Sequence, residues 1–173
     1  MTAHSKIEIA QSNDCPAMTA HVERWRAQCI DGFAQLEVVI EELLRELQAV
    51  SKKGSKVRTG ELVGVAFGHL RELTGANGPF AQKGAKVAAT LSQLSPWFEW
   101  RAHLTHGVLS LWRGSNGRWL LSFAHRPAGG GNGPVRFFAL PWADAQQLKT
   151  DLLEHVEALR ENARSLSNAV RKP

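Results

Sequence analysis

The chain has 173 residues, enough for one domain with a sizeable buried core, and its 43% apolar and 21% charged residues are ordinary globular composition. No apolar run is long enough to span a membrane, and the opening MTAHSKIEIAQSNDCPA lacks the basic start and apolar stretch of a secretion signal. We therefore expect a cytoplasmic protein without a membrane partner, and the net charge of +5 favours a nucleic-acid partner only modestly.

The N-terminal part of the chain is expected to combine a tail with a long helix. Residues 1–16 show no periodicity and predict a disordered tail before a single domain over 17–170. A helix is predicted over 17–51, because apolar residues recur there at steps of three and four. Its stripe consists of Trp25, Cys29, Phe33, Leu36, Ile40, Leu43, Leu44 and Leu47. Cys29 is therefore interpreted as a core residue, and Cys15 and Cys29 as free thiols in a reducing compartment.

A second helix is predicted over 59–74, with three glycines spaced four apart on it. Gly60, Gly64 and Gly68 would form a stripe that lets another helix backbone approach closely. The alternative is that Gly60 lies in the preceding loop and that the other two glycines have no packing role.

Two shorter helices follow, over 80–94 and 96–106. Ser95 suits the N-cap of the second of these helices, and the proline after it suits the first helical position. Gly107 stands where a left-handed residue is expected to stop the helix.

The periodicity then changes from that of a helix to that of strands. Strands are predicted over 108–113, 118–124 and 135–140, with a hairpin turn at Asn116-Gly117. A closing helix is predicted over 144–168, because its leucines again recur at helical spacing. The predicted fold class is mainly α: a helical bundle with a small antiparallel hairpin or meander inserted before the last helix.

The segment before Gly107 concentrates the residues best suited to chemistry. Arg101, His103 and His106 lie within two helical turns of one another. An imidazole can take the proton of a ribose 2′-hydroxyl or give one to a leaving oxygen, and a guanidinium can bind the phosphate through two donors. Such a group suits cleavage of RNA without a metal. Arg101 and His106 are five positions apart, so two copies of the chain meeting across a dyad would make a better site than one helix.

This segment resembles the HEPN family, whose members carry an Arg, four to six residues and then a His near the end of a helix in a helical bundle. Arg101 to His106 has that form, and Gly107 and the short hairpin before the last helix also look like HEPN members. The resemblance implies a homodimer with both motifs facing a shared cleft and, in active members, metal-independent RNA cleavage, often in toxin or defence roles. It implies that Arg101 clamps the phosphate and that His106 is the acid or base. Our enzyme hypothesis adds His103 as a supporting residue. Ala102 departs from the pattern, because active members usually have a polar residue at this place.

A non-catalytic interpretation stands beside the enzyme. A His near a helix C-terminus interacts favourably with the helix dipole, and Arg101 could pair with Glu99. The chain would then be an HEPN-like interaction or scaffold protein with a protein partner, such as a member of a toxin–antitoxin or phage-defence system.

Two further segments and the histidine pair of 96–106 bear on ligand binding. Lys52, Lys53, Lys56 and Arg58 form a basic loop that either contacts RNA phosphates or is a solvated turn. The His103–His106 pair has no third or fourth ligand nearby, so no metal site is predicted. The glycine-rich run 129–133 lacks the Lys-Ser/Thr ending of a phosphate loop, and no cofactor is expected.

Overall fold

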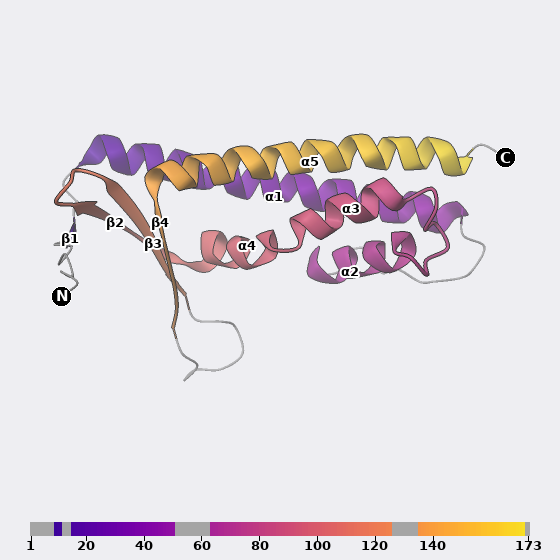
Figure 1. Ribbon diagram of the computed structural model, residues 1–173, viewed down its shortest axis with the longest axis horizontal. Coiled ribbons are helices and arrows are strands. Elements are labelled where there is room, and N and C mark those ends of the chain that lie inside the picture. Colours follow the sequence, from indigo (N-terminus) through magenta and orange to yellow (C-terminus); the bar gives the residue numbers. More distant parts are fainter. Residues whose placement is uncertain (1–8, 12–14, 51–62, 126–134, 172–173) are drawn as a thin grey trace, which may run out of the picture. The chain divides into compact units, whose positions relative to one another are not determined.

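The computed structural model describes residues 9–11, 15–50, 63–125 and 135–171 (Figure 1). These residues form a mainly helical protein with one small antiparallel sheet. The elements in chain order are β1 (Ile9–Gln11), α1 (Pro16–Val50), α2 (Val63–Thr74), α3 (Ala85–Leu94), α4 (Trp97–His106), β2 (Val108–Gly114), β3 (Trp119–His125), β4 (Arg136–Pro141) and α5 (Trp142–Arg171). None of the described helices combines the length and the apolar character that crossing a membrane requires.

The chain divides into two compact units. The first, here called the sheet unit, comprises residues 1–30 and 99–151, and the second, here called the helical unit, comprises 31–98 and 152–173. Both α1 and α5 contribute residues to each unit. The prediction of a single domain over 17–170 stays a prediction.

The buried stripe predicted for the first helix is confirmed along α1. All eight of the predicted residues are at most 2% exposed, because the repeat of three and four residues places them on one side of the helix. In the sheet unit the Trp25 ring lies 6.2 Å from the ring of Phe123 and 6.0 Å from that of Trp142. Its indole N–H donates a hydrogen bond of 2.7 Å to the carbonyl of Ala145, so this large side chain is buried with its polar atom paired.

The sheet has the strand order β1-β2-β3-β4, and all neighbouring strands are antiparallel. The predicted hairpin is confirmed, with Gly117 at a φ of 76° in the turn. The Gly114 N–H donates to the Arg118 carbonyl over 2.9 Å, and the Arg118 N–H donates to the Asn116 side chain over 3.0 Å. One face of the sheet is buried through Leu111, Leu121, Phe123 and Leu140.

The N-terminal segment differs from its prediction. Ile9–Gln11 lies inside the predicted disordered tail of residues 1–16, yet these residues pair with Trp112 to Gly114 of β2. The open edge of β2 supplies hydrogen-bond partners for three residues, a run too short to carry a periodic signal of its own.

The other predicted elements agree with the structure within a few residues, apart from the start of the third helix. Residues 81–84 form a turn instead, in which the Gly84 N–H donates to the Phe80 carbonyl over 2.7 Å, and α3 begins at Ala85. The start predicted for the second helix, 59–62, lies outside the described residues.

The predicted close approach along the glycine stripe is wrong for the two glycines that can be examined. A Cβ added at Gly64 or at Gly68 would meet no atom within 4 Å, so open space surrounds both positions. Gly60 lies outside the described residues.

Candidate functional site

Helix α4 carries the three residues that the sequence analysis predicted as catalytic. Arg101 and His103 are half-buried, and His106, the last residue of the helix, is exposed. At 3.6 residues per turn, Arg101 and His106 leave the helix in directions about 140° apart. His103 and His106 differ by only about 60°, so these two residues share a face of the helix.

His103 is paired with a second histidine that was not among the predicted site residues. Its Nδ1 lies 3.1 Å from Nδ1 of His125, the last residue of β3, and the two rings are perpendicular with centroids 4.5 Å apart. His125 is only 8% exposed. In a hydrogen bond between two imidazoles one Nδ1 donates and the other accepts, so each ring fixes the tautomer of the other.

An aromatic ring from β4 contacts His103, and a ring from α4 contacts that β4 ring in turn. The ring of Phe138 lies 5.6 Å from that of His103, and it meets the ring of Trp100 edge to face at 4.0 Å. Phe138 stands opposite the buried Phe123 in the strand register, so these contacts place His103 against the buried face of the sheet, where its orientation is restricted.

The surroundings of His103 favour its neutral form. Burial lowers the pKa of His103, and the nearby charges of His125 and Arg136 lower it further, while Glu99 acts in the opposite direction. Arg136 stands opposite His125 in the β3–β4 pairing, so the sheet register brings its positive charge to the histidine pair. A neutral imidazole in a positive environment is suited to accept a proton close to a bound anion.

The C-terminal end of α4 is fixed by an arginine from α1. The Nε–H of Arg26 donates to the Leu104 carbonyl over 2.7 Å, and its Nη2 donates to the Gly107 carbonyl over 3.0 Å. Carbonyls at the end of a helix lack partners within the helix, so a cation at this place satisfies them and complements the dipole. Arg26 therefore helps to hold the helix end that carries His103 and His106.

The left-handed conformation predicted for Gly107 is wrong. Among the described residues Gly117 alone has a positive φ, and the Gly107 N–H continues the helical pattern by donating to the His103 carbonyl over 2.9 Å. Glycine is needed for a different reason, because a Cβ at Gly107 would lie 2.3 Å from that same carbonyl oxygen and 3.3 Å from Cβ of Phe123.

The sequence analysis also considered a basic loop, Cys29 and a metal site, and the structure bears on each of them differently. The basic loop of Lys52, Lys53, Lys56 and Arg58 lies outside the described residues. Burial raises the pKa of the Cys29 thiol to about 12, which agrees with a core residue rather than a nucleophile. In the described parts of the chain no three His, Cys, Asp or Glu side chains gather in a way that could hold a metal ion.

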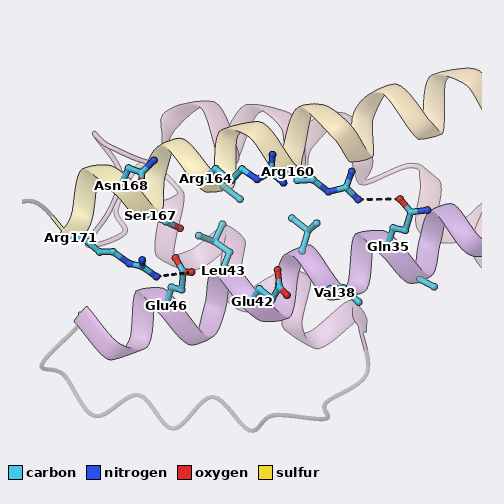
Figure 2. Close-up of a pocket in the computed structure, with 13 residues that line it drawn as sticks. Gln35, Val38, Glu42, Leu43, Glu46, Arg160, Arg164, Ser167, Asn168 and Arg171 are labelled. Atoms are coloured by element: carbon cyan, nitrogen blue, oxygen red, sulfur yellow. Dashed lines mark hydrogen bonds and ion pairs between the residues drawn. The ribbon is translucent and has the colours of Figure 1, made fainter.

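A groove runs between α1 and α5 within the helical unit, with a volume of about 560 Å³ (Figure 2). Its residues come from two sides: Ala34, Gln35, Val38, Val39, Glu42, Leu43 and Glu46 of α1, and Arg160, Ala163, Arg164, Ser167, Asn168 and Arg171 of α5. The α1 side is acidic and the α5 side is basic, while the floor is apolar. No sequence motif marked this groove, because its two sides lie more than a hundred residues apart in the chain.

Comparison with known proteins adds no relative: no protein-family model, no curated protein and no solved structure matches this chain.

Proposed function

We propose that this protein is an HEPN-like endoribonuclease that cleaves RNA without a metal ion. Its catalytic residues would be Arg101, His103 and His106 of α4. The observation that supports the proposal most is the hydrogen bond between the two Nδ1 atoms of His103 and His125. A hydrogen bond to a second ring holds a histidine base in one tautomer. The base held here, His103, lies on the same helix as the predicted Arg101–His106 motif.

The proposed reaction begins at His103. In its neutral form His103 donates Nδ1–H to His125, which leaves the lone pair of its Nε2 to accept the proton of a ribose 2′-hydroxyl. The 2′-oxygen then bonds to the adjacent phosphorus, and the bond from phosphorus to the 5′-oxygen breaks. His106 gives a proton to that leaving oxygen. The products are a 2′,3′-cyclic phosphate and a 5′-hydroxyl.

Arg101 is proposed to bind the phosphate and to stabilise the charge that builds on its oxygens. Because Arg101 and His106 point about 140° apart on one helix, we propose a composite site at a homodimer interface. There Arg101 of each chain would serve the phosphate held at His106 of the other chain.

The proposal is tested by incubating the pure protein with RNA in EDTA. Replacing a general acid or base costs about 10²- to 10⁴-fold in rate, so His103→Ala and His106→Ala should each lose at least about 100-fold. His125→Phe should lose less and should alter the pH profile of cleavage, because His125 acts through His103. His21→Ala is the matched control, since His21 is an exposed histidine on α1. Unchanged cleavage by both α4 variants would refute the proposal.

The rival proposal is an HEPN-like interaction or scaffold protein without catalysis, in a toxin–antitoxin or phage-defence system. A specific observation favours it: Val108 and Phe137 are 70% and 66% exposed, and both stand opposite Ala124 in the strand register, so they share one face of the sheet. A protein partner that covers this face would protect Val108 and Phe137 from solvent. The rival predicts a stable complex and no RNA cleavage.

A further inference from the structure

The sheet has a second face, opposite the buried one, that presents two aromatic rings. Side chains alternate between the two faces along each strand, so the strand register assigns this face, here called the outer face. Phe137 is 66% exposed on it, and Trp112, two rows of residues further along, is half-buried. The outer face consists of Val108, Ser110, Trp112, Leu120, Ser122, Ala124, Phe137 and Ala139. Exposed apolar and aromatic side chains gathered on one face mark a surface that a ligand covers.

Trp112 is held in place on the outer face by a hydrogen bond. Its indole N–H donates to the Ser122 hydroxyl of the neighbouring strand over 2.7 Å. Ser122 is only 3% exposed, because the indole extends across it. A ring that is already fixed, with its polar atom paired, loses little further freedom when a flat ligand stacks on it. By strand spacing and rise, Cα of Ser122 lies about 8 Å from Cα of Phe137, so the two rings are neighbours on this face.

The charges of the strands favour a polyanion as the occupant of the outer face. Residues 108–125 and 135–141 contain three exposed arginines, Arg113, Arg118 and Arg136, and neither Asp nor Glu. Arg136 begins β4 directly before Phe137, whereas Arg118 lies at the hairpin turn, at the opposite end of the sheet. A nucleic-acid strand whose bases lie on the outer face would therefore find a guanidinium for its phosphates at either end.

We propose that the outer face is a binding site for single-stranded RNA, in which unpaired bases stack on Phe137 and Trp112. The bases must be unpaired, because within a duplex their flat faces are covered by neighbouring bases. The inference deepens the proposed cleavage, and it rests on that function for the choice of RNA as the nucleic acid.

The outer face ends beside the histidine pair. His125 stands opposite Arg136 at the end of the strands, one residue beyond the row of Phe137. By strand spacing and rise, Cα of His125 lies about 6 Å from Cα of Phe137. A base stacked on Phe137 would therefore hold the neighbouring sugar and phosphate at the end of the sheet where His103 is bonded to His125.

The test measures binding apart from cleavage, with a short fluorescent RNA in which every 2′-hydroxyl is methylated. This RNA lacks the group that the proposed reaction needs, so it stays whole during the measurement. The wild type should bind the single strand at least about 10-fold more tightly than the same strand paired with its complement. Circular dichroism checks that each variant used below keeps the fold.

Substitutions on the outer face separate stacking from apolar contact. Phe137→Leu keeps an apolar side chain but removes the ring, and it should weaken binding about 5- to 100-fold. Phe137→Tyr keeps a ring and should bind like the wild type, and Trp112→Leu should weaken binding as Phe137→Leu does. Val108→Ser is the matched control, because Val108 is 70% exposed in the same row as Phe137 but has no ring to stack on.

Several results would overturn this inference. They are a wild type that does not bind the methylated RNA, equal binding of the single and the paired strand, and Phe137→Tyr that binds as weakly as Phe137→Leu. A loss with Val108→Ser as large as that with Phe137→Leu would also overturn it and would favour a protein partner on this face. Ring-dependent binding of the methylated RNA by a protein that leaves unmodified RNA whole would uphold the inference and refute the proposed cleavage.

Discussion

Replacing Arg26 should destabilise the protein through the end of α4. Arg26→Met keeps an apolar stem of similar length but removes both hydrogen bonds, of 2.7 Å to the Leu104 carbonyl and 3.0 Å to the Gly107 carbonyl. Hydrogen bonds from a charged group contribute about 1.5–3 kcal/mol each. Because Arg26 is half-exposed, water can replace part of this interaction, and we expect a loss of about 2–3 kcal/mol in the free energy of unfolding.

Urea unfolding of Arg26→Met against Arg24→Met measures this loss. Arg24 is exposed on the same helix, two positions away, so the control removes the same charge without the two carbonyl contacts. The Arg24 variant should stay within about 0.5 kcal/mol of the wild type, as surface substitutions usually do. Equal stabilities of the two variants would refute the capping role of Arg26.

Three further predictions concern single residues. The folded protein holds the His103 proton less tightly than the unfolded chain does, so the free energy of unfolding should be highest above about pH 6.5 and should fall as the pH drops below it. Urea unfolding at several pH values should show a flatter pH dependence for His103→Asn than for the wild type. The same pH dependence in both proteins would contradict this prediction. Gly107→Ala should lower the free energy of unfolding by about 2–4 kcal/mol, because its Cβ would meet the His103 carbonyl at 2.3 Å. Gly68→Ala, in open space on a helix, should raise it by about 0.5–1 kcal/mol. Thermal unfolding that ranks the two variants in the opposite order would contradict the packing described around these glycines. A chromogenic disulfide reagent should titrate the half-exposed Cys15 in the folded protein and Cys29 only after unfolding, and rapid reaction of both thiols would show that Cys29 is not buried.

Local sequence patterns predicted most of the described elements, because their causes lie within a few residues. The stripe of α1 repeats every three or four positions, and the hairpin depends on Asn116 and Gly117, which occupy the turn themselves. The strand Ile9–Gln11 was missed because it forms only against the edge of β2, about a hundred residues away. A pattern of three residues cannot encode such a partner.

The candidate site was predictable only in part, for a similar reason. His103 was identified from its neighbours on α4, but its partner His125 comes from β3, and Arg26, which bonds the carbonyls at the end of α4, comes from α1. Each of these contacts depends on the tertiary fold rather than on spacing along the chain. The one sequence signal for His125 was its place directly after a predicted strand, and Arg26 follows the buried Trp25 on the predicted first helix.

The central claim is that the histidines of α4 move protons to and from an RNA linkage without a metal. The most direct measurement compares, in EDTA, the cleavage of one RNA strand with that of the DNA strand of the same sequence. The claim predicts that only the RNA is cut, that its products end in 2′,3′-cyclic phosphates, and that His103→Ala cuts the RNA at least about 100-fold more slowly. Intact RNA with the wild type, or equal cutting of the DNA strand, would contradict the claim.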